Sequence, residues 1–458
     1  MMRPLAWLLA LSVLASPLLA DEDRTAGLAA YEARNYREAF SRLSTARQNA
    51  PDDREIAIRA YSAAMELAKE LLAAKQYRDV LPLCEWALGI DRELLPEDLR
   101  FVASYNKGEA FLGLGKADEA LIWLKEAREL TKRPVVLREL GMAYYKKEAW
   151  PDAVLSFTQY SQSPEVKKDA NLIQHLAHAT YQAGDIAKAL EIVRQARLEF
   201  PQDPTLAQLE TKYSREDRTE GNMQQSSGVY FDVKFEETPD QQDLRSRILK
   251  ALDEAYSQVT RSYSHFPDKN VPVVIYSSNV AFGEGSGAPR WAAANFDGKI
   301  RIPVEAAKAS DDSLRRVVTH EFTHYIVHRI TKGNCPAWIH EGLAQIEEKN
   351  EKEWASATLR RYMGNRNLKA QILDLSRLES SFGSIQDSEL ANLAYAESYL
   401  ATKFIVDRHG AHEVSQILDA LSTGSSFADV LSNRLGVDSA GFQKQWLTAQ
   451  AEEFHLEW

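Results

Sequence analysis

Two histidines and a glutamate within residues 320–324, which read His-Glu-Phe-Thr-His, have the types and spacing of a metal-dependent hydrolase. Residues four apart lie on nearly the same face of an α-helix, so His320 and His324 can direct both imidazoles at one ion. Glu321 lies one residue further round, where its carboxylate can take a proton from a water at the open coordination position. The pattern predicts the helix half of a zinc site with its own general base.

The motif needs a helix, and the surrounding sequence predicts one. Residues 311–313 (Asp-Asp-Ser) offer a helix start, and apolar residues from Leu314 to Phe322 recur at helical spacing. The alternative is a partly exposed helix face that carries two histidines without a metal. The mid-helix position of the motif and a carboxylate at Glu341 favour the metal site.

A third ligand is expected from the segment that follows. A break over residues 332–336 (Lys-Gly-Asn-Cys-Pro) precedes a second predicted helix that opens near Trp338, with Glu341 in its first turns. A carboxylate from this helix completes a His, His, Glu set and leaves one position for water. His340 is the rival ligand, but it points about 100° away from Glu341 on a helix.

Residues 336–344 read Pro-Ala-Trp-Ile-His-Glu-Gly-Leu-Ala, and they place Glu341 after a gap of 16 residues from the first motif. Together the two segments resemble the peptidase MA-like family of gluzincin-type zinc metallopeptidases, over roughly the last half of the chain. The resemblance implies zinc (Zn²⁺) held by the two motif histidines and Glu341, Glu321 as general base, and hydrolysis of peptide bonds. Gln345 replaces an aspartate of some relatives, and its amide could hydrogen-bond a ligating histidine.

The region around the motif carries the signals of an α+β domain. Elements expected before the motif are a strand at 229–235, an amphipathic helix at 240–263 and a buried strand at 271–276. The Phe-Asp-Gly-Lys turn at 296–299 predicts a hairpin. We expect residues 298–302 to form a sheet edge that pairs with extended substrate. The Gly-rich stretch 283–287 predicts a flexible loop at the rim.

Peptide hydrolysis also needs a donor that stabilises the developing oxyanion. Tyr395 and Tyr399 lie one turn apart on one helical face, and the family resemblance places this helix near the zinc. Tyr395 is the candidate donor, and a role in core packing is the alternative.

The N-terminal half, residues 21–212, has a different organisation. Small or apolar residues recur every 33–41 residues in successive second helices, at Ala39, Val80, Ala120, Ala153 and Ala189. They resemble tetratricopeptide repeats, whose period is about 34 residues. Five helix pairs predict an α-solenoid, whose groove would recruit a protein partner. An irregular helical bundle is the alternative.

Residues 1–20 have the features of a secretory signal peptide. Arg3 precedes an apolar run from Leu5 to Ala20, and acidic residues follow directly. A membrane anchor is the alternative, but about 16 apolar residues are short for a span. We therefore expect an exported protein, periplasmic or secreted, without a stable membrane anchor. The polar segment 213–228 is expected to link the repeats to an α+β, zincin-like domain at 229–458.

The charge balance argues against polyanionic partners. Without residues 1–20, which contain a single basic residue, the chain has 54 lysines and arginines against 66 acidic residues, a net charge of −12. This excess disfavours nucleic acid and anionic membrane surfaces as partners. The two cysteines, Cys84 and Cys335, fall in different predicted domains and form no disulfide framework.

Two functional classes follow from these features. In the first, the protein is an exported zinc peptidase whose repeats recruit a peptide or protein substrate or a partner. In the second, it is a periplasmic scaffold or assembly factor that works through its repeats, with a latent or vestigial metal site. The intact Glu321 favours the enzyme, because a general base serves only chemistry. The ligands by themselves also allow another hydrolysable bond as the target.

Overall fold

The computed structural model divides the chain into two compact units, residues 1–217 and 218–458, which are described separately. The described residues are 21–167, 169–236, 238–287, 295–296, 298–379, 382, 385 and 387–457. The predicted signal peptide, residues 1–20, lies outside them. No helix within these ranges is both long enough and apolar enough to cross a membrane.

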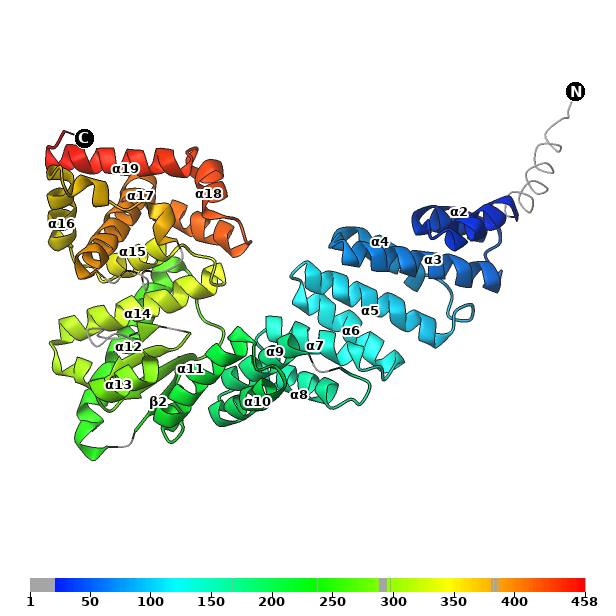
Figure 1. Ribbon diagram of the computed structural model, residues 1–458, viewed down its shortest axis with the longest axis horizontal. Coiled ribbons are helices and arrows are strands. Elements are labelled where there is room, and N and C mark those ends of the chain that lie inside the picture. The colour runs from blue at the N-terminus through cyan, green and yellow to red at the C-terminus, as the bar shows by residue number, and fades with distance from the viewer. Residues whose placement is uncertain are drawn as a thin grey trace, which may run out of the picture. The chain divides into compact units, whose positions relative to one another are not determined.

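The first unit is built from helices (Figure 1). Residues 21–32 are helical, and the helices that follow are α2 (Tyr36–Asn49), α3 (Arg54–Ala73), α4 (Tyr77–Leu88), α5 (Glu97–Gly113), α6 (Ala117–Leu130), α7 (Val135–Lys146), α8 (Trp150–Ser161), α9 (Ala170–Gln182), α10 (Ile186–Glu199) and α11 (Pro204–Glu220). Each helix from α2 to α9 packs on the next, and α10 and α11 share an apolar cluster. Helix α5 also contacts α3 and α7, the first helices of the neighbouring pairs. This arrangement confirms an α-solenoid rather than an irregular bundle.

The predicted repeat positions lie at the closest helix contacts. The residues that recur in second helices are all fully buried, at Ala39, Val80, Ala120, Ala153 and Ala189. On the first helices, a Cβ at Gly108 would lie 2.6 Å from Leu124 Cγ, and one at Gly141 would lie 2.5 Å from the Phe157 ring. Glycine on one helix therefore lets a large side chain of its partner nest against the backbone.

The segment expected to be a linker, residues 213–228, is instead ordered structure. It contains the end of α11 and strand β1 (Gln224–Ser227), although the boundary between the units does fall within it. Tyr213, Glu216 and Glu220 are at most 1 % exposed and recur at helical spacing. Their buried face is polar and aromatic, so hydropathy did not reveal the helix.

The second unit contains a five-stranded sheet in the order β1-β2-β3-β5-β4. The remaining strands are β2 (Phe231–Phe235), β3 (Val271–Tyr276), β4 (Asn295–Phe296) and β5 (Ile300–Pro303). Strands β2, β3 and β5 run parallel, and β1 and β4 are antiparallel to their neighbours. The predicted strands at 229–235 and 271–276 are confirmed, as is the hairpin, in which Phe296 pairs with Ile300.

The prediction that residues 298–302 form a sheet edge is wrong. Strand β5, which covers most of this range, pairs with β3 on one side and with β4 on the other. The outermost strand next to β5 is therefore β4. Two residues are too few to show the alternation that identifies a strand in sequence.

The helices of the second unit form two groups, one packed on the sheet and one around α15, α17 and α19 (Figure 1). They are α12 (Gln242–Tyr263), α13 (Asn279–Ser286), α14 (Asp311–Thr331), α15 (Ala337–Glu347), α16 (Glu353–Gly364), α17 (Ser388–Ser422), α18 (Phe427–Val430) and α19 (Ser439–Phe454). Helices α12 and α14 share one apolar core with the sheet, which includes Leu252, Val273 and Phe322. A second core, which includes Trp338 and Trp446, joins α15 to α17 and α19.

The Gly-rich stretch 283–287 is also not the expected loop. Most of it belongs to α13, and only Gly287 has a left-handed backbone, at the helix C-terminus. A Cβ on Gly285 would lie 2.7 Å from the Tyr276 hydroxyl oxygen. Close packing on a neighbouring strand, rather than flexibility, therefore explains this glycine.

Candidate metal centre

Helix α14 carries the His-Glu-Phe-Thr-His motif. Its N-cap is Ser310, whose hydroxyl accepts the backbone N–H of Ser313 at 3.2 Å, one residue before the predicted start at 311–313. The motif lies in the middle of the helix, as the sequence predicted. The Nε2 atoms of His320 and His324 lie 3.1 Å apart. Two imidazole nitrogens thus converge on one point beside the helix.

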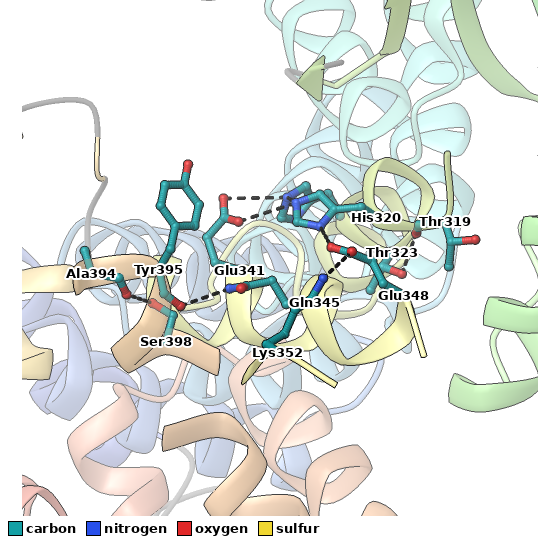
Figure 2. A network of polar contacts seen from close by, with 11 residues as sticks. Thr319, His320, Thr323, Glu341, Gln345, Glu348, Lys352, Ala394, Tyr395 and Ser398 are labelled. Atoms are coloured by element: carbon teal, nitrogen blue, oxygen red, sulfur yellow. Dashed lines mark hydrogen bonds and ion pairs between the residues drawn. The ribbon is translucent and has the colours of Figure 1, made fainter. Parts of the chain in front are cut away.

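Glu341 on α15 faces both histidines. Its two carboxylate oxygens lie 3.5 Å from His320 Nε2 and 3.6 Å from His324 Nε2, and Figure 2 shows the carboxylate directed at the His320 ring. The ligand atoms of the three residues all lie within 4.8 Å of one another. A tetrahedral zinc ion with bonds of about 2.0–2.1 Å separates its ligand atoms by about 3.3 Å. The three side chains therefore fit the corners of such a site.

His340, the rival to Glu341, does not join this group. Its ring stacks on the His324 ring with the centroids 4.6 Å apart and the planes only 5° from parallel. The ring of Phe296 on β4 also lies near His324, at 6.5 Å between centroids. His340 and Phe296 thus restrict the orientation of the His324 imidazole rather than offering another ligand.

Glu321 lies beside the three candidate ligands and is 7 % exposed. Burial raises the pKa of its carboxyl group to about 7, and the nearby His320 opposes this shift. Its Oε2 atom is buried, and no hydrogen-bond partner for it occurs among the described residues. A buried, unpartnered carboxylate is costly to maintain, and its pKa suits proton transfer near neutral pH.

The two motif histidines differ in their preference for a proton. Burial disfavours the His320 cation, but the Glu341 and Glu348 carboxylates outweigh burial and raise its pKa to about 10. Burial and the neighbouring His320 instead hold the pKa of His324 well below its usual value. The pair therefore carries one positive charge in the metal-free protein. This charge lies where a bound metal ion would otherwise provide positive charge.

Glu348 was not anticipated from the sequence. It is the C-cap residue of α15, and its Oε1 atom accepts a hydrogen bond from His320 Nδ1 at 2.9 Å. Its other oxygen, Oε2, lies 2.5 Å from Lys352 Nζ. Glu341, Gln345 and Glu348 recur at helical spacing, and this one-sided polar stripe was the available signal.

The Gln345 amide does not hydrogen-bond either candidate ligand histidine, contrary to the prediction. The residue is 4 % exposed, and its side-chain amide donates to the backbone carbonyl of Tyr395 on α17 at 3.1 Å (Figure 2). One turn beyond Glu341, the side chain faces α17 rather than α14. The partner expected for the histidine is supplied by Glu348 instead.

Tyr395 lies beside the candidate metal centre. Burial raises the pKa of its phenol, and the charges of Glu341 and Glu321 raise it further. Figure 2 shows its side chain next to Glu341. The Phe382 ring packs edge-on against the tyrosine ring, with the centroids 5.2 Å apart. By contrast, the hydroxyl of Tyr399 lies 3.5 Å from Glu351 Oε2. Of the two tyrosines, Tyr395 is the one beside the candidate ligands.

Comparison with known proteins agrees with the family inferred from the motif. Residues 264–451 match the model of the Peptidase MA superfamily, and this confirms the resemblance for that part of the chain. No curated protein matches the chain. Two similar solved structures are a Pseudomonas aeruginosa pilF structure and PilW, described as a widely conserved type IV pilus biogenesis factor. Both are 16 % identical to this chain; they cover 43 % and 42 % of it and 98 % and 97 % of their own length, with TM-scores of 0.29 and 0.28.

Proposed function

Given that residues 264–451 match the Peptidase MA superfamily, we propose that this chain is a zinc-dependent peptidase that hydrolyses peptide bonds in a peptide or protein substrate. The observation that carries the proposal is the tetrahedral fit of three side chains on two helices. His320, His324 and Glu341 would hold the ion, with a buried carboxylate next to them. When bound, zinc supplies a Lewis acid that activates water and polarises a carbonyl group.

Glu321 is proposed as the general base. A carboxyl group with a pKa of about 7 can accept a proton from the attacking water and later donate it to the leaving amine. Its Oε2 atom is buried and without a partner among the described residues, so it is available to a water or substrate atom. The Glu321 carboxylate would thus hold the proton between its removal from water and its donation to the leaving amine.

Tyr395 is proposed as the donor to the oxyanion. Its raised pKa keeps the phenol protonated near neutral pH, as a hydrogen-bond donor must be. The bond from Gln345 to the Tyr395 carbonyl ties this part of α17 to the helix that carries Glu341. The donor and a ligand are therefore held by the same helix contact.

The repeats are proposed to recruit the substrate or a protein partner, because stacked helix pairs offer an extended surface for peptides.

We further propose that the protein is exported to the periplasm or secreted, on the basis of the sequence of residues 1–20. The acidic excess supports neither nucleic acid nor an anionic membrane surface as a partner.

A scaffold with a vestigial metal site is less favoured. Such a protein would gain nothing from the desolvated carboxyl group of Glu321, which costs stability unless it is used. The match to a peptidase superfamily also favours the enzyme.

Digestion of a peptide library tests the proposal. The chain without residues 1–20 is incubated with the library and zinc, and new peptide termini are identified by mass spectrometry. We expect cleavage that is lost in Glu321→Gln, by about 10²–10⁴-fold, and kept in Glu347→Gln, a change of the same type at a residue bonded to Gln258 and Ser262. An intact library, with zinc shown to be bound, would support the scaffold instead.

A further inference from the structure

We infer that Glu348 and Lys352 form a positioning pair that holds His320 in the ring orientation and tautomer required of a metal ligand. The inference rests on the proposed function, since it concerns the same metal centre. Neither residue belongs to the His-Glu-x-x-His motif or to the ligand set. The contacts of both side chains, their burial and the local charge support it.

The contact between Glu348 and His320 determines which ring nitrogen is free. The Nδ1 atom lies 2.9 Å from Glu348 Oε1, so this nitrogen carries the hydrogen and donates it to the carboxylate. In the neutral imidazole that a metal requires, the lone pair is then left on Nε2, which is the atom that faces His324 and Glu341. A carboxylate in this place also makes the imidazole a stronger donor to a metal.

Lys352 fixes the carboxylate in turn. Its side chain is 9 % exposed, and its ammonium group lies 2.5 Å from Glu348 Oε2. A lysine so deeply buried needs an anionic partner. Because Lys352 engages one oxygen, the carboxylate cannot rotate freely, and the other oxygen stays directed at His320.

The backbone between the two residues brings them together. Glu348 ends α15, Lys349 has a left-handed backbone with φ of 51°, and Lys352 is the N-cap of α16. The turn between the two helices thus directs both side chains inward, toward α14. Figure 2 shows Glu348 placed between the His320 ring and Lys352.

Charge balance gives Lys352 a second role. Glu321, Glu341 and Glu348 place three carboxylates at this centre, and all three lie in a largely buried region. A divalent ion together with the Lys352 ammonium balances these three negative charges. Without the lysine, the occupied site would retain a net negative charge in a region of low dielectric constant, which is unfavourable.

A purely structural role is the competing explanation, in which the pair only ties α14 to the turn after α15. The two explanations differ in what they predict for metal binding. A structural tie affects the unfolding of the metal-free protein and leaves the imidazole tautomer unchanged. A positioning pair affects zinc affinity and the protonation pattern of His320 even where the metal-free fold is intact.

Zinc affinity provides the test, by competition with a chromophoric chelator, in the chain without residues 1–20. We expect Glu348→Gln to weaken zinc binding by about 10–100-fold, and Lys352→Gln to weaken it in the same direction by less. Glu347→Gln is the matched control, because its carboxylate is adjacent in sequence but bonds Gln258 and Ser262. In the zinc-loaded protein, ¹⁵N NMR of histidine should show a hydrogen on His320 Nδ1 in wild type and a weakened Nδ1 hydrogen bond in Glu348→Gln.

The outcomes separate this inference from the proposed function. Equal zinc affinity in wild type, Glu348→Gln and Glu347→Gln would overturn the inference, as would a loss fully explained by unfolding of the metal-free variant. A wild-type chain that binds no zinc would overturn both proposals. Weakened zinc binding in Glu348→Gln, in a protein that cleaves no peptide, would support the positioning pair and contradict the peptidase.

Discussion

Gly342 on α15 lies so close to Thr402 on α17 that a Cβ on the glycine would come within 2.6 Å of the Thr402 Cβ and overlap its hydroxyl oxygen. The backbone carbonyl of Ser398 blocks the same space. Gly342 directly follows the candidate ligand Glu341, so the contact that brings the two helices together also sets the distance of the carboxylate from α14. A residue without a side chain is required at this position.

Replacing this glycine should therefore damage both the fold and the metal centre. We expect Gly342→Ala to lower the free energy of unfolding of the second unit by about 1–3 kcal/mol through overpacking, and to weaken zinc binding because Glu341 is displaced. Urea unfolding and the chelator competition measure the two effects. Gly364→Ala is the control, because a Cβ there meets only Leu456, at 3.8 Å or more. Equal stability of the two variants would contradict this account of the helix contact.

Metal addition should stabilise the second unit in particular. Zinc at 100 times its dissociation constant adds about 2.7 kcal/mol to the folded state. We expect this gain to appear as slower hydrogen exchange in α14 and α15, with no change in α7 of the repeat unit. His324→Ala should abolish the effect, because it removes one of the three proposed ligands. Protection that persists in this variant would place the zinc elsewhere.

The convergence of the three candidate ligands could be predicted because helical periodicity brings them together. His320 and His324 share a helix face because of their spacing. Glu341 follows in a second helix, whose start is predicted by the break that contains Pro336. The repeats could also be predicted from the sequence, because close helix contacts require small residues, such as Ala120 and Gly141, at regular intervals.

Other features depended on tertiary contacts that no local pattern records. Gln345 could bond either a histidine or α17, and only the crossing of the helices decides between them. Glu348 lies at a helix end, where a glutamate usually faces solvent. The outermost position of β4 follows from pairing between Phe296 and Ile300 rather than from a strand-like sequence. The helix around Glu216 buries a polar face, whereas a helix is usually recognised in sequence by an apolar face at helical spacing.

Tyr395 and Tyr399 offer a matched pair for testing the oxyanion donor. We expect Tyr395→Phe to lower kcat by about 10²–10³-fold with little change in KM, because the hydroxyl would act mainly on the developing charge. Tyr399→Phe should leave kcat unchanged, since its hydroxyl is near Glu351. Steady-state kinetics on a cleaved library peptide measures both. Equal, small effects of the two changes, together with lower thermal stability, would assign Tyr395 to core packing.

The repeat unit should lose stability as the pH rises from about 4.3 to about 7, because of Glu139 on α7. Its carboxyl group is 7 % exposed, and burial raises its pKa to about 7, with the adjacent Arg138 opposing the shift. A carboxyl group whose pKa is higher in the folded than in the unfolded chain favours folding when protonated. Its contribution is complete below the unfolded-state pKa of about 4.3 and is lost as the pH rises to about 7.

Glu139→Gln should remove this pH dependence. An uncharged amide of similar shape has no proton to lose, so the variant should be more stable than wild type at pH 8, by up to about 3 kcal/mol, and similar to it at pH 4.5. Hydrogen exchange in α7, measured at both pH values and corrected for the intrinsic exchange rate, reports the difference. Glu129→Gln, at an exposed position on α6, is the control and should behave as wild type. A Glu139→Gln chain that is less stable than wild type at pH 8 would show that the bond from Arg138 to Glu139 outweighs the cost of burying the charge.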